Sequence, residues 1–294
     1  MLLNASERDP IKVADWIELQ VLYSPSKSFS LESVRSRIDA EGSLAETSPD
    51  DEEDSSEQLI AIAQEEMERR RTIVGAAYPF EISDGVAKAT VTAKYVPYVF
   101  SLLVADREYY SPDDNDSKIF FEHLVTLAVK KYFDCESLRF GAPRDTMPPG
   151  IVDAINKLSE KTGIKIVRGY DVNCTDRDLG LDVAAWKTHT DLRPNMLLLY
   201  LQCATGIHWT TKKSDCNLAE WRGLLYWQVD PIRGLAVPYV LSEDEWARET
   251  VGLLFLDRLR IAACLQGFGP RDCEIDWWKW CKSRIREGRA RNRS

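Results

Sequence analysis

The sequence lacks several features that would assign a protein to a class at once. No apolar run among the 294 residues approaches the roughly 20 residues that a membrane-spanning helix needs. There is no GxxxxGK[ST] phosphate-binding loop and no GxGxxG fingerprint, so nothing supports a P-loop or Rossmann enzyme. The amino-terminal segment shows no basic stretch followed by a long apolar one, and we therefore expect no signal peptide.

Histidine is scarce, and no cysteines are spaced as a pair. His123, His189 and His208 are too few for a site built on several imidazoles, so any metal should be a hard cation held by oxygen ligands. The seven cysteines are scattered singly, which is typical of free thiols and not of a disulfide framework or a zinc ribbon. We therefore predict a cytoplasmic protein whose metal would be Mg²⁺ or Mn²⁺.

The formal net charge of −9 is unevenly distributed along the chain. Residues 43–57 carry seven acidic side chains and no basic one, and without them the chain is close to neutral. Residues 279–294 carry seven basic side chains against the single acidic Glu287. Because the charge is so polarised, the overall negative sign does not exclude an anionic partner such as DNA.

The amino-terminal part, residues 1–112, predicts an accessory α+β module with no legible chemistry. Its acidic stretch 43–57 is poor in apolar residues and is expected to be a solvated or disordered linker. Apolar spacing and capping residues predict helices at 12–22, 30–42 and 57–71. Residues rich in β-formers predict strands at 86–93 and 95–105, after an Asp84–Gly85 turn.

Residues 113–270 predict an α/β (α+β) core of helices and strands. Pro238 in the last expected strand suggests a position at the edge of the sheet. Residues 271–294 predict an aromatic and basic helix that frays into a tail. The helices of the core are expected at 117–133, 151–163, 218–229 and 243–265. The strands are expected at 164–171, 179–187, 195–205 and 234–242.

Four short motifs in the core carry residues suited to phosphodiester hydrolysis. Glu122 lies within the first core helix, Asp178 and Asp182 open one strand, and Gln202 ends the next. Strand alternation puts Asp182 on one face with Ala184 and Trp186. Carboxylates and an amide carbonyl at neighbouring strand ends can hold Mg²⁺, which would activate an attacking water. The candidate metal ligands are therefore Asp182, Asp178, Glu122 and Gln202.

A positive charge beside the phosphate would complete such a site. Lys212 and Lys213 follow Gln202 at the approach to a helix and are the candidates for it. Lys187 ranks lower, because its odd offset from Asp182 points it to the other face of the strand. The candidate catalytic residues are therefore Glu122, Asp182, Gln202, Lys212 and Lys213.

The order of these motifs resembles the PD-(D/E)XK nuclease superfamily, in its Mrr-like restriction endonuclease branch. That branch carries a helical Glu, a D-x-G-x-D strand and a Q-x-K strand. Glu122, the DLGLD string of residues 178–182 and Gln202 match it, and Ala204 stands where the branch has its lysine. The resemblance covers about a third of the chain and implies a restriction-endonuclease-like core in which helices flank a mixed central sheet. It also implies Mg²⁺-dependent DNA cleavage and a role in bacterial antiviral or anti-plasmid defence.

Basic residues in two segments could hold the phosphate backbone of DNA with little reading of its sequence. RFGAPR places Arg139 and Arg144 around a flexible loop, and the carboxyl-terminal helix offers Arg284 and Arg286 near a tryptophan cluster. Each segment also has an interpretation without DNA. The RFGAPR segment could simply be a tight connection, and the carboxyl-terminal segment could be a helix that docks on the body of the protein and ends in a solvated basic tail.

Several alternatives remain open at this point. Asp178 and Asp182 could belong to an ordinary polar turn, and Gln202 could serve a structural hydrogen-bond network. Because the strand lysine is absent, the chain could be an inactive nuclease fold that acts as a DNA-binding or protein-interaction scaffold in a multiprotein defence complex. An RNA-directed or nucleotide-triggered toxin nuclease is a third hypothesis. The expected partners are DNA and other protein subunits, with no membrane, and homo-oligomer formation is left open.

Overall fold

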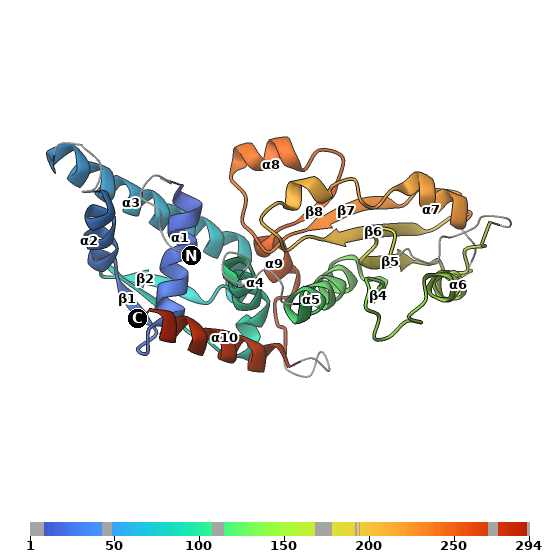
Figure 1. The fold of residues 1–294 in the computed structure, drawn as a ribbon, viewed down its shortest axis with the longest axis horizontal. Helices are drawn as coiled ribbons and strands as arrows, with labels where there is room; N and C mark the ends of the chain where they lie inside the picture. Colours follow the sequence, from blue (N-terminus) through green and yellow to red (C-terminus); the bar gives the residue numbers. More distant parts are fainter. Residues whose placement is uncertain are drawn as a thin grey trace. The chain divides into compact units, whose positions relative to one another are not determined.

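The computed structural model describes residues 9–42, 49–107, 115–167, 178–191, 193, 195–269 and 276–292. The chain forms two compact units, and each combines segments that are far apart in the sequence (Figure 1). Unit 1 comprises Met1–Tyr110, Tyr239–Ser242 and Arg258–Ser294, and unit 2 comprises Ser111–Pro238 and Glu243–Asp257. The carboxyl-terminal helix therefore belongs to the same unit as the amino-terminal module, whereas the sequence suggested a separate segment.

Unit 1 is a set of helices beside a small antiparallel sheet of order β1-β3-β2. Its strands are β1 (Ser28–Ser30), β2 (Phe80–Ser83) and β3 (Val86–Ala89). Its α-helices are α1 (Pro10–Tyr23), α2 (Leu31–Gly42), α3 (Pro49–Val74), α4 (Val96–Arg107), α9 (Arg258–Cys264) and α10 (Trp277–Arg291). Two 3₁₀ turns, η1 (Gly75–Ala77) and η2 (Ala93–Tyr95), precede β2 and α4.

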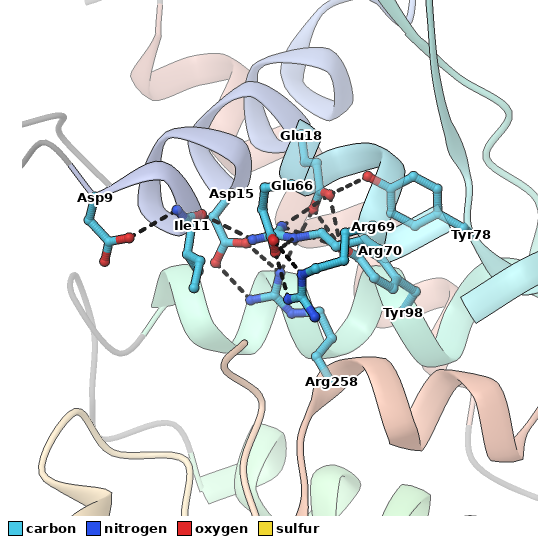
Figure 2. A network of polar contacts seen from close by, with 10 residues as sticks. All are labelled: Asp9, Ile11, Asp15, Glu18, Glu66, Arg69, Arg70, Tyr78, Tyr98 and Arg258. Atoms are coloured by element: carbon cyan, nitrogen blue, oxygen red, sulfur yellow. Dashed lines mark hydrogen bonds and ion pairs between the residues drawn. The ribbon is translucent and has the colours of Figure 1, made fainter. Parts of the chain in front are cut away.

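A buried polar network ties the helices of unit 1 together (Figure 2). The Arg258 guanidinium on α9 makes a bidentate ion pair with Asp15 on α1, with donor–acceptor distances of 2.7 and 2.8 Å. Arg70 on α3 bonds the same carboxylate at 2.6 Å and also contacts Glu18 at 3.1 Å. Tyr98 donates to Glu18 at 2.8 Å. Both arginine side chains are fully buried, so residues at opposite ends of the sequence depend on one another for their partners.

Two expectations for unit 1 are wrong in part. Residues 96–105 belong to the helix α4 and not to a strand. Residues 95–106 are all buried, and a mostly apolar segment that is buried on all sides shows neither helical nor strand periodicity. The acidic stretch is not all linker, since α3 already begins at Pro49. Residues 43–48 of that stretch lie outside the described residues.

Unit 2 is built on a five-stranded mixed sheet of order β4-β5-β6-β7-β8 (Figure 1). Its strands are β4 (Glu136–Arg139), β5 (Val183–Lys187), β6 (Leu197–Cys203), β7 (Ile232–Ala236) and β8 (Leu254–Leu256). The first three strands pair antiparallel, and β6, β7 and β8 run parallel. Its helices are α5 (Asn115–Phe133), α6 (Ile151–Thr162), the 3₁₀ turn η3 (Trp209–Lys212), α7 (Leu218–Leu224) and α8 (Glu243–Glu249).

Helices cover the sheet of unit 2, because its inner strands are apolar on both faces. One face contributes Leu138, Ala184 and Tyr200 to a core that includes residues of α6 and α7. Helix α5 packs against β4, β5 and β6, and its own buried residues take no part in that core. The fold class predicted from the sequence, an α/β core with a mixed sheet flanked by helices, is therefore confirmed.

Several elements of unit 2 differ from the expectations. The stretch 243–265 is not one helix: α8 ends at Glu249, Gly252 turns with a φ of 76°, and β8 follows. Strand β7 lies inside the sheet and ends at Ala236, so Pro238 does not mark an edge strand. Helix α7 ends at Leu224, five residues before the expected helix end.

The short strand β4 was not among the expected strands, and only its last residue, Arg139, had been placed, in a loop. The expected strand 164–171 is reduced, within its described residues 164–167, to a single bridge between Ile166 and Leu225. Among the helices that the structure describes, none is both long and apolar enough to cross a lipid bilayer.

Candidate functional site

Asp182 lies where the ladder between β5 and β6 ends. The last paired residues are Val183 and Leu201, and two residues beyond Leu201 in β6 the Cys203 N–H donates to Asp182 Oδ2 at 2.7 Å. The carboxylate therefore takes over a backbone amide that the ladder no longer pairs. This bond fixes one carboxylate oxygen and leaves Oδ1 to face the end of strand β4. Asp182 does not point into the apolar core, which agrees with the position expected for a site residue.

Glu122 reaches the same place from helix α5, and Gly141 is where the two carboxylates meet. A Cβ atom on Gly141 would lie 2.5 Å from Glu122 Oε2 and 3.0 Å from Asp182 Oδ1. The two oxygens therefore lie within 3.0 Å of one point in space, which only a glycine leaves open. The backbone holds this arrangement, because the amides of Phe140 and Gly141 both donate to the Asp182 carbonyl, at 2.7 and 3.1 Å.

Arg139, the last residue of β4, lies beside this carboxylate pair. Its Nε is 2.7 Å from Glu122 Oε2, and its side chain is only 1% exposed. Its Nη1 donates to the Pro143 carbonyl at 2.8 Å and reaches Asp145 Oδ1 at 3.4 Å. Neither Arg139 Nε nor Glu122 Oε2 makes an aligned hydrogen bond within the described residues, so the contact is an ion pair with unused bonding capacity.

Burial dominates the electrostatics of the site. Burial and the charge of Asp182 raise the pKa of Glu122 to about 8. Burial also raises the pKa of Asp182 to about 7, against the opposing effects of the Cys203 amide, Arg139 and Lys212. Two buried carboxylates that face each other favour a shared proton, and a divalent cation can replace that proton.

Gln202 is placed at the same end of the sheet, but its amide does not complete the pair. It follows Leu201 in β6 and is 7% exposed. Strand alternation turns it to the same face as Tyr200, toward the core under α6 and α7. Within the described part of the chain, no hydrogen bond joins the Gln202 amide to Glu122 or Asp182. Its role as a metal ligand stays a prediction.

Asp178 begins a tight turn that leads into Asp182. Its Oδ1 accepts the Gly180 N–H at 3.0 Å, and its carbonyl accepts the Leu181 N–H at 3.1 Å. Gly180 has a φ of 70°, and a Cβ there would lie 2.3 Å from the Asp215 carbonyl oxygen. The glycine of the DLGLD string is therefore needed for backbone shape and close approach. One oxygen of Asp178 serves the turn, and its charge still contributes to the raised pKa of Asp182.

The two candidate lysines are engaged elsewhere. Lys212 in η3 pairs with Asp215 at 2.9 Å, and its side chain is 57% exposed. Lys213 pairs with Glu249 of α8 and stacks over the Trp209 ring at 5.9 Å. The charge of Lys212 nevertheless lowers the pKa of Asp182. Their catalytic role stays a prediction, in which Lys212 is the better placed of the two.

The four candidate DNA-binding arginines do not share one environment. Arg139 is buried, which corrects the expectation that it lies in a phosphate-contacting loop. Arg144 lies in that loop, stacked 4.7 Å over the Phe140 ring. On α10 of unit 1, Arg284 pairs with Glu287 at 2.9 Å and is 24% exposed, while Arg286 is exposed. Of the other three, Arg144 is the nearest in the chain to Gly141, where the two carboxylates meet.

The donor set at Gly141 fits a hard divalent cation. The pair offers Glu122 Oε2, which is buried without an aligned hydrogen bond, and Asp182 Oδ1. No group of three or more His, Cys, Asp or Glu side chains surrounds a common position in the residues described. Mg²⁺ is usually bound by one or two carboxylates with waters and substrate oxygens, so two carboxylates are sufficient.

Two residues of this site have roles other than those that the sequence predicted. Gly141 was taken as loop flexibility, whereas it provides the space between two carboxylates. Arg139 was taken as a surface residue, because the strand that turns it inward was not expected. A signal existed in the alternation of Leu138 and Phe140, which are both buried in the core and frame the arginine between them.

Comparison with known proteins adds little to this geometry. No family model matches the chain, and no curated protein matches its sequence. Among solved structures, the chain is similar to the MspJI restriction endonuclease in complex with a 27-mer oligonucleotide, at 9% identity and a TM-score of 0.31. The likeness covers 67% of this chain and 39% of that one. A likeness this low carries no argument about function.

Proposed function

We propose that unit 2 is a Mg²⁺- or Mn²⁺-dependent DNA endonuclease of the PD-(D/E)XK type, acting in bacterial defence against foreign DNA. The observation that carries the proposal is the convergence of Glu122 and Asp182 on Gly141, at the sheet end where the sequence motifs meet. The sequence resemblance supports the choice of DNA and of the Mrr-like branch. The defence role is implied by that resemblance alone.

In this proposal Asp182 and Glu122 hold the cation, and Asp178 and Gln202 orient or complete the site. The cation would supply positive charge at the scissile phosphate and acidify the attacking water. Asp182 is held in place by the Cys203 amide, so its free Oδ1 is already oriented. Arg144 is partly exposed in the adjoining loop and would contact the phosphate backbone, which positions DNA without reading its sequence.

Cleavage of supercoiled plasmid and linear duplex with Mg²⁺, Mn²⁺ or EDTA tests this function. We expect metal-dependent nicking or linearisation that falls by about 100-fold or more in Asp182→Asn. The asparagine oxygen can still accept the Cys203 N–H, so the strand end should keep its structure. Asp191→Asn, at an exposed loop residue, is the matched control and should cleave normally. Normal cleavage by Asp182→Asn would refute the proposed site.

A second candidate function is an inactive nuclease fold that serves as a scaffold for DNA or other proteins. Two observations favour it: Ala204 occupies the lysine position, and Lys212 and Lys213 are both paired with carboxylates. Fluorescence anisotropy with labelled duplex DNA separates the two functions. Binding of DNA with no cleavage in either metal would support the scaffold, whereas binding with cleavage would exclude it.

A further inference from the structure

The structure places one fixed cation beside the carboxylate pair, and it is not a lysine. Arg139 sits at the end of β4, where it pairs across the ladder with Val183, the residue after Asp182. Its Nε lies 2.7 Å from Glu122 Oε2. Two neighbouring amides, those of Phe140 and Gly141, are bonded to the Asp182 carbonyl. The backbone that bonds to Asp182 thus also carries the guanidinium.

The guanidinium is anchored from behind as well. Its Nη1 bonds the Pro143 carbonyl at 2.8 Å and approaches Asp145 at 3.4 Å. Asp145 is fixed in turn, because its Oδ2 lies 2.5 Å from His123 Nε2 and its Oδ1 accepts the Thr146 N–H at 2.8 Å. A planar fork held on one edge has little freedom to turn. The position of Arg139 is therefore set by its contacts with Pro143 and Asp145, and not by Glu122 alone.

The other edge of the Arg139 guanidinium, formed by Nε and Nη2, has a hydrogen-bond donor that is not used. Nη2 is buried and has no hydrogen-bond partner within the described residues, whereas Nε meets Glu122 Oε2 as an ion pair at 2.7 Å. A buried donor without a partner, as Nη2 is, needs an explanation, and a catalytic or ion-binding role is among the known ones. Lys212 and Lys213, by contrast, already neutralise Asp215 and Glu249.

We propose that Arg139 is the positioning cation of this site: it holds Glu122 toward Asp182 and balances the charge of the two carboxylates. The inference rests on the proposed nuclease function, and its chemistry is electrostatic. Arginine suits the position, because it stays charged when buried, whereas a buried lysine readily loses its proton. No step requires Arg139 to touch the DNA.

Equilibrium binding of Mn²⁺ gives a test that does not depend on cleavage. Arg139→Gln removes a positive charge beside both carboxylates. At pH 9, where both are ionised, the variant should bind Mn²⁺ about tenfold more tightly by calorimetry. The same variant should cleave DNA about 100-fold more slowly, because Glu122 is no longer held in place. A purely structural role for Arg139 would not tighten metal binding.

Two further variants sharpen the result. Arg139→Lys keeps the charge and should bind Mn²⁺ within about threefold of the wild type, with cleavage at least tenfold above that of Arg139→Gln. Arg222→Gln removes a cation from an exposed pair with Asp230 and should change neither property. Circular dichroism establishes which variants are folded. If Arg139→Gln unfolds, the cleavage rate of Arg139→Lys decides whether Arg139 has the proposed role. An Arg139→Lys protein that cleaves DNA as slowly as Asp182→Asn overturns the inference.

The outcomes separate this inference from the proposed function. Unchanged Mn²⁺ affinity in folded Arg139→Gln overturns the role of Arg139, whatever the cleavage rate. Wild-type protein that binds Mn²⁺ through Asp182 but cuts no DNA overturns the nuclease function, while tighter binding in Arg139→Gln still supports Arg139 as the balancing cation. Wild-type protein that binds no Mn²⁺ overturns both.

Discussion

Gly141 controls the distance between the two site carboxylates, and its role is a matter of volume. A methyl group there would collide with Glu122 Oε2 and crowd Asp182 Oδ1. Because Asp182 is tied to the Cys203 amide and Glu122 to Arg139, neither carboxylate can move without losing a partner. The residue therefore links backbone geometry directly to the metal binding that we propose.

We predict that Gly141→Ala weakens Mn²⁺ binding by about tenfold or more, since ligand groups displaced from a site commonly cost that much in affinity. The crowding should also cost about 1–3 kcal/mol of the free energy of unfolding. Gly150→Ala is the matched control, because its Cβ would meet nothing closer than 3.8 Å. Calorimetry and thermal unfolding of the two variants measure both effects. Equal Mn²⁺ affinity in Gly141→Ala and wild type would contradict the site.

The two raised carboxylate pKa values predict how stability depends on pH in the absence of metal. Asp182 and Glu122 have pKa values of about 7 and 8 in the folded state, whereas unfolded carboxyls titrate near 4. Between these values the folded state holds protons that the unfolded state has released, so the free energy of unfolding decreases as pH rises from about 5 to about 8.

Thermal unfolding in EDTA across this pH range measures the effect. The melting temperature of the wild type should fall as pH rises, and the fall should be shallower in Asp182→Asn. A variant at an exposed carboxylate, Asp191→Asn, should follow the wild-type curve. Identical slopes in the Asp182 and Asp191 variants would show that Asp182 does not titrate in this range.

Among the elements of the chain, the DLGLD turn brings Asp182 to its strand by packing against another loop. Gly180 adopts a left-handed φ of 70°, and its Cα faces the backbone of Asp215. Gly252 has a similar φ of 76°, but nothing lies within 4 Å of the place where its Cβ would be. Substituting each glycine by alanine therefore measures two contributions to the free energy of unfolding. The Gly252 variant has the cost of the left-handed backbone alone, and the Gly180 variant adds the cost of the close approach to Asp215.

We predict that Gly252→Ala costs about 1–2 kcal/mol of the free energy of unfolding, from left-handed strain alone. Gly180→Ala should cost clearly more, because its methyl group would overlap the Asp215 carbonyl, and it should also slow cleavage by displacing Asp182. Urea unfolding curves of both variants provide the comparison. Equal costs would mean that the two loops do not pack as the structure shows.

The sequence predicts an element well where its apolar residues follow a regular pattern, and poorly where the element is buried on all sides. Strands β5 and β6 and helix α5 were predicted, since their apolar patterns and lengths fit one structure only. Helix α4 and strand β8 were not, because apolar runs such as those at 95–105 and 251–256 fit a helix and a strand equally well. The carboxylates of the site were found from their motifs. Arg139 was named only as a DNA contact, and its burial beside Glu122 was not predicted, because its orientation depends on pairing between β4 and β5.

At the scale of the whole molecule, the chain crosses between its two units more than once, and unit 1 depends on residues near both ends of the sequence. Arg258 and Arg70 share Asp15, and burial would raise the pKa of Asp15 if the two guanidinium charges did not lower it below its usual value. Removing one arginine leaves a buried carboxylate without its full compensation.

We predict that Arg258→Met lowers the free energy of unfolding of unit 1 by about 3–5 kcal/mol, the typical cost of breaking a buried ion pair. Arg260→Met, at an exposed position two residues further along α9, should change it by less than about 1 kcal/mol. Hydrogen exchange of α1 and α3 peptides in the full chain provides the readout. Unchanged protection in Arg258→Met would show that the network is not a main source of stability.

We propose that Glu122 and Asp182 form a metal site at Gly141, and anomalous diffraction from crystals grown with Mn²⁺ tests this most directly. We expect an anomalous peak beside Gly141, next to the Glu122 and Asp182 carboxylates, and none there in Asp182→Asn crystals. A wild-type structure at saturating Mn²⁺ with no peak at that position, or with the ion bound by other residues, would contradict it.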